Sequence, residues 1–426
     1  MLKKEGFKLV AIIVLLLGFH FGQAQNSISS PYSKYGFGLP SNVTCGAYDA
    51  MGKVGYAMQN PYLINFKNPA SYAAFDSLSF IADAAFSIYS STLRTSEISQ
   101  KATYARPGYF TLGLPVTKHW RTSAGILPFS NLGYSIIDSK SMDNVTSVTY
   151  SYDADGGLLQ LYWGNAFKIC KGLSIGLNAS YMFGTLSYSQ SAIYDGSYFF
   201  NTRVSRTILV DGIYLSGGIQ YFTTIKNKHR LGFGLVYENT AYLWTKQTDF
   251  IYNYSVSGTS EVLNDSVSYN NGKSNMRIPQ TIGGGISYQY KDKLWITADV
   301  AWKNYSKFAV GGETSNEMRD AITTSAGLQF VTNATSSNYL KKIRLRVGAR
   351  YTTGQIVLNN HPIQDFSVSF GLGFPLKLYS NNSSLGVMFE YGQMGTIKYN
   401  LVKENYFRIS LHFTLQEKWY QRVKLE

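Results

Sequence analysis

The sequence predicts an all-β fold: a 14-stranded antiparallel transmembrane β-barrel with an N-terminal plug or hatch segment in its lumen. Three observations support this prediction. Segments of roughly ten residues alternate apolar and polar side chains, most plainly near the end of the chain in residues 404–416. Short basic connections alternate with long polar ones between these segments, and an apolar N-terminal run precedes them all. A barrel with lipid outside and a wet or plugged lumen explains the two unlike faces of each strand.

Residues 1–24 have the pattern of a secretory signal peptide. Lys3, Lys4 and Lys8 precede an apolar run over residues 9–21, and the small residues that follow favour cleavage after Ala24. The apolar run is shorter than the roughly 20 residues that a transmembrane helix needs. We therefore expect the mature chain to reside in the outer membrane of a Gram-negative bacterium and to cross that membrane with its strands.

Residues 25–76 lack sustained alternation and are expected to form the plug. A barrel of eight strands is already filled by its own side chains, and diameter grows with strand number, so a barrel of this size needs filling. The segment is rich in turn residues and ends in Asn68, Pro69 and Ala70, just before the first strand. These three residues form the predicted hatch motif.

Alternation and turn residues together predict a barrel over residues 77–416. The longest loop, 248–277, is expected on the extracellular side, because outer-membrane barrels have short periplasmic turns. An even strand count brings the chain back to the periplasm, where residues 417–426 form a tail. A secreted β-sandwich, the competing fold, gives no reason for the alternating loop lengths. The predicted strands lie near residues 77–92, 106–117, 120–136, 157–169, 172–190, 204–222, 229–247, 278–290, 294–304, 320–331, 342–353, 366–377, 384–393 and 404–416.

Composition and charge agree with a membrane barrel. Charged residues make up 15% of the chain, against about 25% in soluble domains. The 34 Tyr and 25 Phe suit the aromatic girdles of a barrel. The net charge of +14 does not indicate nucleic-acid binding, because many lysines fall in the short connections and would form a rim. Such a rim suits outer-membrane lipids, lipopolysaccharide or a protein partner.

Pro128 lies in the middle of the third predicted strand, with Ser130 and Gly133 shortly after it. Proline lacks the N–H that a β-ladder needs, and a closed barrel has no edge strand where it would be tolerated. The sequence therefore predicts a bulge or a gap in the wall at this point. Two interpretations remain open, a lateral opening at Pro128, Ser130 and Gly133, or a bulge that merely bends the strand.

Several charged residues fall on the lumen side of the predicted strands. Because buried charges need partners, we expect them to pair with one another or with the plug. The arginines also have the chemistry to receive the carboxylate of a fatty acid, which is the less favoured alternative. This predicted lumen cluster contains Arg344, Arg346, Arg350, Glu390 and Arg408.

The sequence predicts no enzymatic activity, no metal site and no cofactor. Residues 172–176 match the Gly-x-Ser-x-Gly pattern around Ser174, but they begin a strand, whereas a nucleophile elbow needs a strand, a sharp turn and a helix. The histidines of the mature chain are scattered and lack metal-ligand spacing. A disulfide between Cys45 and Cys170 stays open, because spacing alone does not establish its geometry.

The signal peptide, the glycine-rich plug, the Asn68-Pro69-Ala70 motif and the strand number resemble the FadL/TodX superfamily of outer-membrane channels for hydrophobic compounds. This resemblance implies passive uptake of molecules like long-chain fatty acids, movement of the hatch and lateral escape at the third strand. The closing segment 407–413, followed by Trp419, Arg422 and Lys424, is similar to a PorV-like branch that serves protein secretion. The alternative function is therefore that of a barrel subunit in a secretion or assembly complex.

Overall fold

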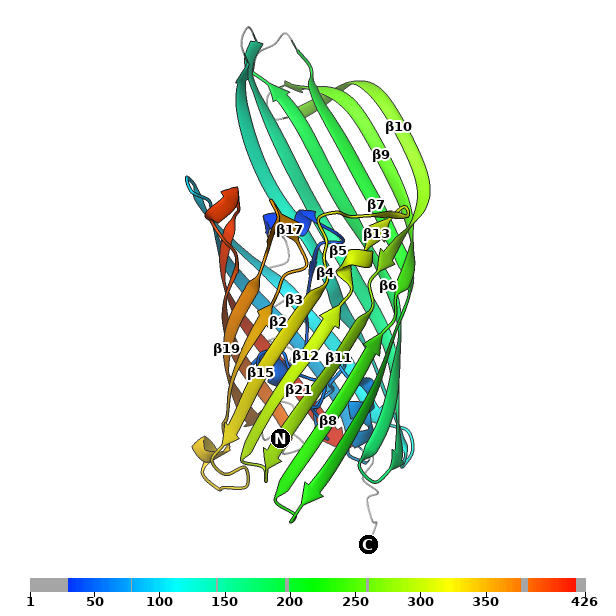
Figure 1. Ribbon diagram of the computed structural model, residues 1–426, viewed down its shortest axis with the longest axis vertical. Coiled ribbons are helices and arrows are strands. Elements are labelled where there is room, and N and C mark those ends of the chain that lie inside the picture. Colours follow the sequence, from blue (N-terminus) through cyan, green and yellow to red (C-terminus); the bar gives the residue numbers. More distant parts are fainter. Residues whose placement is uncertain are drawn as a thin grey trace, which may run out of the picture.

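The computed structural model describes residues 30–77, 79–142, 145–195, 199–257, 260–376 and 382–418. The predicted signal peptide and residues 419–426 lie outside this range. The chain forms a closed 14-stranded antiparallel barrel, as predicted (Figure 1). The first and last strands of the wall pair with each other from Ser79–Lys418 to Arg94–Lys403, which closes the barrel. None of the described helices is long and apolar enough to cross a membrane.

The wall contains strands β2 (Ser79–Arg94), β3 (Ser99–Pro115), β4 (Trp120–Met142), β5 (Val145–Cys170), β6 (Leu173–Tyr194), β7 (Asn201–Ile225), β8 (His229–Glu238), β11 (Thr281–Tyr290), β12 (Leu294–Lys303), β15 (Ala321–Val331), β16 (Arg344–Thr352), β19 (Asp365–Leu376), β20 (Ser383–Gly395) and β21 (Lys403–Lys418). Short elements in the connections are η3 (Tyr305–Lys307), β13 (Ala309–Val310), β14 (Glu313–Thr314), η4 (Tyr339–Lys342), β17 (Val357–Leu358), β18 (His361–Pro362) and η5 (Lys398–Asn400).

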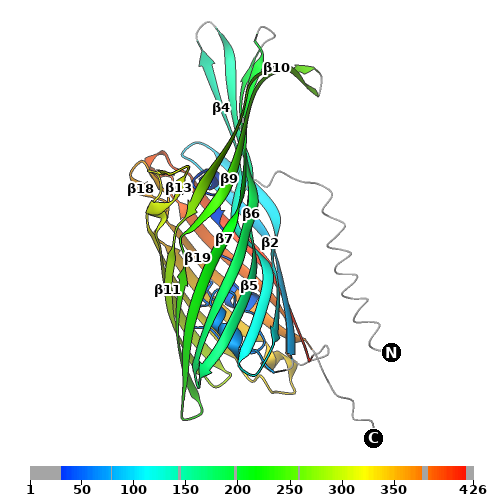
Figure 2. The same cartoon turned by 90° about the vertical axis from the view of Figure 1, so that its right-hand side faces the viewer.

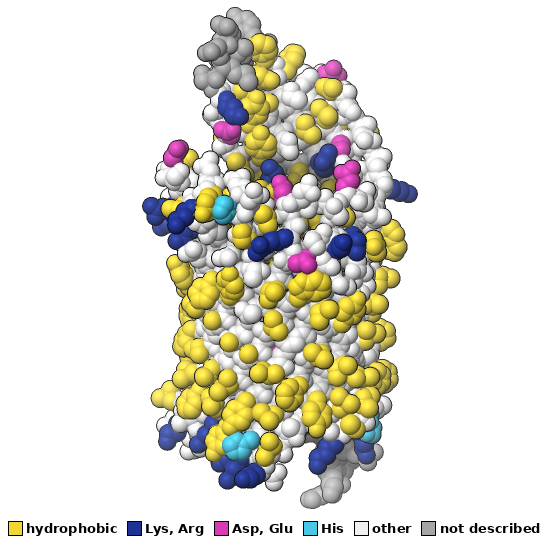
Figure 3. Space-filling model, viewed as in Figure 1, with side chains coloured by type: hydrophobic (Ala, Val, Ile, Leu, Met, Phe, Trp, Pro, Cys, Tyr) yellow, Lys and Arg dark blue, Asp and Glu magenta, His cyan; other side chains and the backbone are white. Residues whose placement is uncertain are grey.

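An apolar belt surrounds the lower part of the barrel. In β8, for example, Phe233, Leu235 and Tyr237 point outward and are exposed, whereas Val236 points inward and is buried. Figure 3 shows the outward apolar side chains as a band around the lower part of the barrel, with lysine and arginine both at the lower rim and above the band. The period-two alternation of the sequence thus places lipid-compatible side chains outside and the remainder inside.

The N-terminal segment lies inside the barrel (Figure 1). It contains η1 (Pro31–Lys34), β1 (Leu39–Pro40), α2 (Gly46–Asp49) and η2 (Pro69–Ala74). Many of its large side chains are buried, Tyr48 and Met51 among them. Wall glycines let the plug backbone come close: a Cβ on Gly348 would lie 2.1 Å from the amide nitrogen of Gly52. The plug therefore fills the lumen by direct backbone contact with the wall.

The predicted strand 229–247 and the predicted loop 248–277 are both wrong. β8 ends at Glu238, and a new strand, β9 (Ala241–Ser257), forms a hairpin with β10 (Ser260–Ile278). β7 pairs with β8 through Ser216–Ile225 and with β9 through Asn201–Asp211. Because β8 and β11 pair directly with each other, the hairpin stands outside the closed barrel.

The upper parts of β4, β5, β6, β7, β9 and β10 form one sheet that rises beyond the mouth of the barrel. We call it the extracellular sheet, because it lies on the side of the longer connections. Figures 1 and 2 show that it stands above one side of the mouth only, while the opposite wall ends much lower. The molecule is thus a plugged barrel with a tall sheet on one side.

Candidate functional site

The wall is incomplete between β3 and β4. These strands pair only from Phe110–Ile126 to Pro115–Arg121. Beyond Ile126, among the described residues, β4 pairs with β5 and with the short plug strand β1, and its ladder with β5 shifts register between Pro128 and Ser130. Pro128 thus lies where the wall opens, at the lower end of a β3–β4 gap. Whether the gap passes a molecule stays a prediction.

The plug covers the edge of β4 that β3 leaves free. Leu39 and Pro40 of β1 lie opposite Asn131 and Ser130. The Ser130 hydroxyl donates to the carbonyl of Phe37 at 2.7 Å. The predicted opening residues therefore hold the plug in place.

A second contact lies higher on the same edge. The amide of Ser30 donates to the carbonyl of Gly133 at 3.1 Å, and the Ser33 hydroxyl donates to the same carbonyl at 3.1 Å. The Ser33 oxygen also accepts from the amide of Gly133 at 3.1 Å. Gly133, too, is a plug-binding residue.

Two adjoining cavities lie behind the gap. One has a volume of about 150 Å³ and is lined by Phe37, Pro128 and Phe129 together with Lys67 and Lys303. The other has a volume of about 140 Å³ and shares several lining residues with it, namely Pro40, Asn42, Lys53 and Arg350. The lining mixes aromatic rings with charged groups, which suits an amphipathic molecule better than a purely apolar one.

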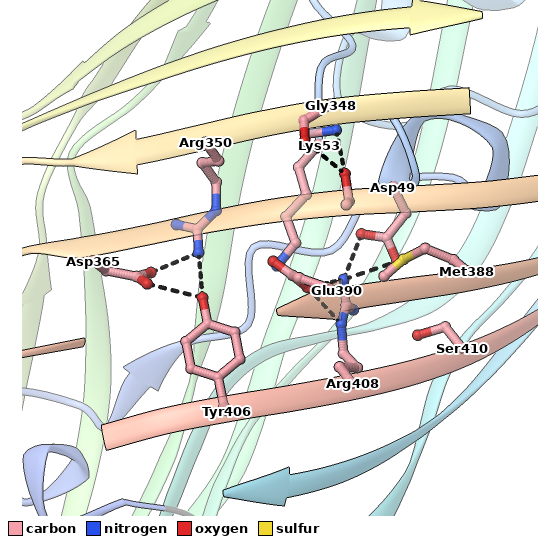
Figure 4. Close-up of polar contacts among 12 residues, drawn as sticks. Asp49, Lys53, Gly348, Arg350, Asp365, Met388, Glu390, Tyr406, Arg408 and Ser410 are labelled. Carbon is pink, nitrogen blue, oxygen red and sulfur yellow. Dashed lines mark hydrogen bonds and ion pairs between the residues drawn. The ribbon is translucent and has the colours of Figure 1, made fainter. Parts of the chain in front are cut away.

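A network of buried charges joins the plug to the last two strands (Figure 4). Arg408 Nε donates to Glu390 Oε2 at 2.7 Å, and Arg408 Nη2 donates to Asp49 Oδ1 at 2.8 Å. Lys53 Nζ lies 3.5 Å from Glu390 Oε1. Burial lowers the pKa of the Lys53 amine to about 8, against the opposing effect of the Glu390 charge. Each charge is matched, as burial requires.

A second charged group lies beside the first. Arg350 Nη2 is 2.5 Å from Asp365 Oδ2, and the Tyr406 hydroxyl donates to Asp365 Oδ1 at 2.8 Å (Figure 4). Two other members of the predicted lumen cluster lie elsewhere: Arg346 Nε donates to Gln329 Oε1 at 2.7 Å, and Arg344 is half-buried at the start of β16. The predicted cluster is thus divided, with only Glu390 and Arg408 bonded to each other.

Several site residues were not predicted as members of the cluster. The inward direction of Asp49 and Lys53 could not be predicted, because the plug sequence has no periodicity that distinguishes buried positions from exposed ones. Asp299 of β12 also points inward, and its Oδ2 accepts from the amides of Gly55 at 2.7 Å and Tyr56 at 3.0 Å. An inward carboxylate can therefore bind plug backbone as well as an opposite charge.

The Asn68-Pro69-Ala70 motif begins η2 at the base of the plug. Asn68 Oδ1 accepts from the amide of Ala70 at 3.1 Å, and Asn68 Nδ2 donates to the carbonyl of Tyr56 at 2.7 Å. Pro69 stands at the start of the helix, where its missing N–H costs nothing. A Cβ on Gly218 would lie 2.0 Å from Asn68 Oδ1, so the motif packs directly on β7.

The cysteines and the Ser174 pattern lie apart from the cavities. Cys45 is buried in the plug, Cys170 is exposed at the end of β5, and both are free thiols. Burial raises the pKa of the Cys45 thiol well above its ordinary value. Ser174 is the second residue of β6, which is followed along the chain by another strand and not by a helix.

Comparisons with known proteins agree with this architecture. The model of the BamG family matches residues 1–426. Similar solved structures include a Pseudomonas aeruginosa FadL homologue (TM-score 0.58, 11% identity, 90% of this chain and 100% of that one) and the P. putida toluene transporter TodX (0.60, 14%, 89% and 100%). The Ralstonia pickettii toluene transporter TbuX is also similar (0.59, 14%, 89% and 99%). A search of curated proteins found no match.

These similarities confirm the resemblance drawn from the sequence at the level of the fold. They show that this chain has the β-barrel fold of the FadL-like outer-membrane proteins. The match over the full length of the sequence goes further, and the chain belongs to the BamG family.

Proposed function

We propose that this protein is a barrel subunit of a multiprotein outer-membrane complex for secretion or assembly. The observation that carries the proposal is the extracellular sheet. Tyr242 and Trp244 of β9 are exposed aromatic residues of the kind that mark the membrane interface. Val256 lies near the other end of this strand, about 40 Å beyond Trp244 at about 3.3 Å per residue.

The top of the sheet carries apolar side chains that neither lipid nor a protein core covers. Leu263 is 56% exposed and Tyr269 67% exposed, and Val256 and Val267 are similarly exposed. Exposed apolar side chains on a sheet far from lipid favour a protein–protein contact. Membership of the BamG family supports a place in a complex.

The plug also favours docking over transport. Its contacts with the wall include backbone hydrogen bonds to Asp299 and the ion pairs of Arg408. Displacing the plug would leave buried charges without their partners, which costs free energy. A docking subunit needs no such movement, whereas a channel does.

Native mass spectrometry tests the proposal, with the tagged protein extracted from its own outer membrane in mild detergent. We expect a stoichiometric assembly with other proteins. A variant in which a short turn replaces residues 241–278 is the matched control, because β8 and β11 still pair and the barrel still closes. This variant should lose the partner. A lone full-length barrel that carries a fatty-acid-sized mass would contradict the proposal.

The β3–β4 gap favours a second function, the passage of small hydrophobic molecules. Pro128 lies at the gap and lines the cavity of about 150 Å³. For a channel, Pro128→Thr should restore a ladder donor and lower the uptake of a labelled long-chain fatty acid. Pro115→Thr, at the end of β3, is the control. If Pro128→Thr leaves uptake unchanged, the passage function is wrong.

A further inference from the structure

The outer edge of β10 is the least protected part of the extracellular sheet. β10 pairs with β9 along its whole length, but among the described residues its other side is bonded only near its end, where Met276 and Arg277 pair with β13 and Asn275 accepts from Gly311. Every residue from Ser260 to Asn275 is exposed. A long strand edge with unpaired backbone groups is a template for another strand, and most proteins cover it.

We propose that residues 268–274 of β10, here called the free edge, pair with an extended segment of a partner protein that adds as an antiparallel strand. The inference rests on the proposed function, and it names where and how the partner binds. Strand addition takes its affinity from main-chain hydrogen bonds, so the free edge recognises an extended peptide and not a folded surface.

The hydrogen-bond pattern shows which backbone groups the free edge offers. The carbonyl of Asn275 accepts from the amide of Gly311 at 2.8 Å, so Asn275 points its backbone groups away from β9. The register is regular from Ser268 to Ile278. In an antiparallel ladder the N–H and C=O of one residue point to the same side and alternate along the strand. Tyr269, Asn271 and Lys273 therefore present N–H and C=O groups to the free edge.

Side chains behind the free edge are already ordered. Tyr269 packs on Phe250 with 6.5 Å between ring centroids, and Phe250 stacks on Tyr252 at 4.9 Å. Arg203 joins this row: its Nη1 lies 2.7 Å from Glu261 Oε2, and it donates to the Tyr252 hydroxyl at 3.2 Å. A partner strand thus meets a preorganised surface, which lowers the entropic cost of binding.

Charges near the free edge specify the direction of the partner. Asp265 and Lys273 have no ion-pair partner among the described residues, unlike Glu261. β10 runs from the tip of the sheet down to the barrel, so an antiparallel partner runs away from the membrane and meets Lys273 before Asp265 (Figure 1). Its matching strand should therefore carry an acidic residue first and a basic residue later.

A second copy of this chain does not fit the proposed antiparallel pairing at the free edge. Two copies in one membrane are related by a two-fold axis along the membrane normal. This axis makes both β10 strands run toward the membrane, hence parallel, whereas the proposed pairing is antiparallel. The partner is accordingly a different protein.

Proline at an outward-pointing position tests the proposal. Asn271→Pro with Lys273→Pro removes two outward N–H donors and keeps the hydrogen bonds to β9, since proline is tolerated on an edge whose N–H faces solvent. Asn271→Ala with Lys273→Ala keeps both donors and is the matched control. For the full-length tagged protein from its own outer membrane, we expect the proline variant to lose partner by about tenfold per barrel relative to the alanine variant. Both variants lack the Lys273 charge, so this difference reports the two outward N–H donors alone.

Two results would overturn the inference, and they differ from each other. Wild-type recovery of partner with the proline variant would exclude the free edge but keep the complex. A wild-type protein that purifies alone would remove the proposed function and the free edge together. If the proline variant does not fold, a photo-crosslinking residue at Tyr269 in the otherwise unchanged protein replaces it. Crosslinks to one extended segment of a different protein support the inference, and crosslinks to a second copy or to none overturn it.

Discussion

Arg408 Nη2 and Asp49 Oδ1 lie 2.8 Å apart and join the last strand of the barrel to the short helix α2 of the plug. Both side chains are buried, and Glu390 is the second acidic partner of Arg408. The same arginine therefore links β21 both to its neighbour β20 and to the plug.

Replacing Arg408 by methionine should release the plug. The change leaves the carboxylates of Asp49 and Glu390 without their cation. Removing one partner of a buried ion pair destabilises the folded state by about 3–5 kcal/mol. Cys45 is buried in the plug and Cys170 is exposed, so thiol labelling of the folded protein reports the change. We expect one labelled cysteine in wild type and two in Arg408→Met.

Arg206→Met is the control for this prediction. Arg206 pairs with Asp249 at 2.8 Å, but its side chain is half exposed on the extracellular sheet. Such a pair contributes about 0–1 kcal/mol. Labelling of Cys45 in this variant, or its absence in Arg408→Met, would contradict the role given to Arg408.

Gly348→Ala should displace the plug without removing a charge. A Cβ at Gly348 would lie 2.1 Å from the amide nitrogen of Gly52, which is backbone and has no room to move aside. Gly217→Ala is the matched control, since its Cβ would meet only the carbonyl oxygen of Gly176 at 3.9 Å. We expect faster thiol labelling of Cys45 in the first variant and wild-type labelling in the second. Equal rates would show that plug contact at Gly348 does not hold the segment.

Gly38→Ala should detach the plug strand β1 from β4. Gly38 has a φ of +91°, and a Cβ there would lie 2.5 Å from the carbonyl oxygen of Asn131. Gly312 has a similar φ of +86° but open space around it. Gly312→Ala is therefore the control, because it carries only the cost of a side chain at positive φ, about 1–2 kcal/mol, without a steric clash. Hydrogen exchange in residues 30–41 should accelerate in Gly38→Ala alone. Unchanged exchange in that variant would rule out a close β1–β4 contact.

The Lys53 amine should react at an unusually low pH. Burial lowers its pKa to about 8, against about 10.4 for an ordinary lysine. Acylation of Lys53, followed by mass spectrometry, should therefore rise through about pH 8. Between these two values the folded state binds fewer protons at Lys53 than the unfolded chain, so the contribution of this group to the free energy of unfolding increases with pH across the window.

Glu390→Gln tests whether the pKa of about 8 belongs to the Lys53 amine. The Glu390 charge raises the pKa of Lys53, so its removal should shift the acylation profile to lower pH. A profile that stays in place would mean that Glu390 does not act on the Lys53 amine.

The barrel could be predicted because lipid imposes a strict rule on every strand. Outward side chains must be apolar, and the resulting alternation is visible without a structure. The extracellular sheet escaped prediction for the converse reason. Residues 260–275 are exposed on both faces, so neither face had to be apolar and no alternation developed.

A signal for the break between β8 and β9 was nevertheless present. Phe233, Leu235 and Tyr237 face outward at odd positions, whereas Tyr242 and Trp244 face outward at even ones. This change of parity marks the two residues, Asn239 and Thr240, at which one strand ends and the next begins.

Plug contacts could not be predicted, because they join residues far apart in sequence. Arg408 and Glu390 were both expected to face inward, and they do. Their third partner, Asp49, lies in a segment whose inside and outside depend on how the whole plug is packed. The inward arginines thus predicted that a partner was needed, but not which residue supplies it.

The uninterrupted run of β7 has a mechanical consequence. Of its 25 residues, Ser216–Ile225 pair with β8 in the barrel wall and Asn201–Asp211 pair with β9 above it, both along the same edge of the strand. No hinge separates the two stretches, so tilting the barrel tilts the sheet by the same angle. A molecule bound at the top of the sheet is therefore held at a fixed distance from the bilayer and in a fixed orientation, by a rigid support and not by a flexible linker.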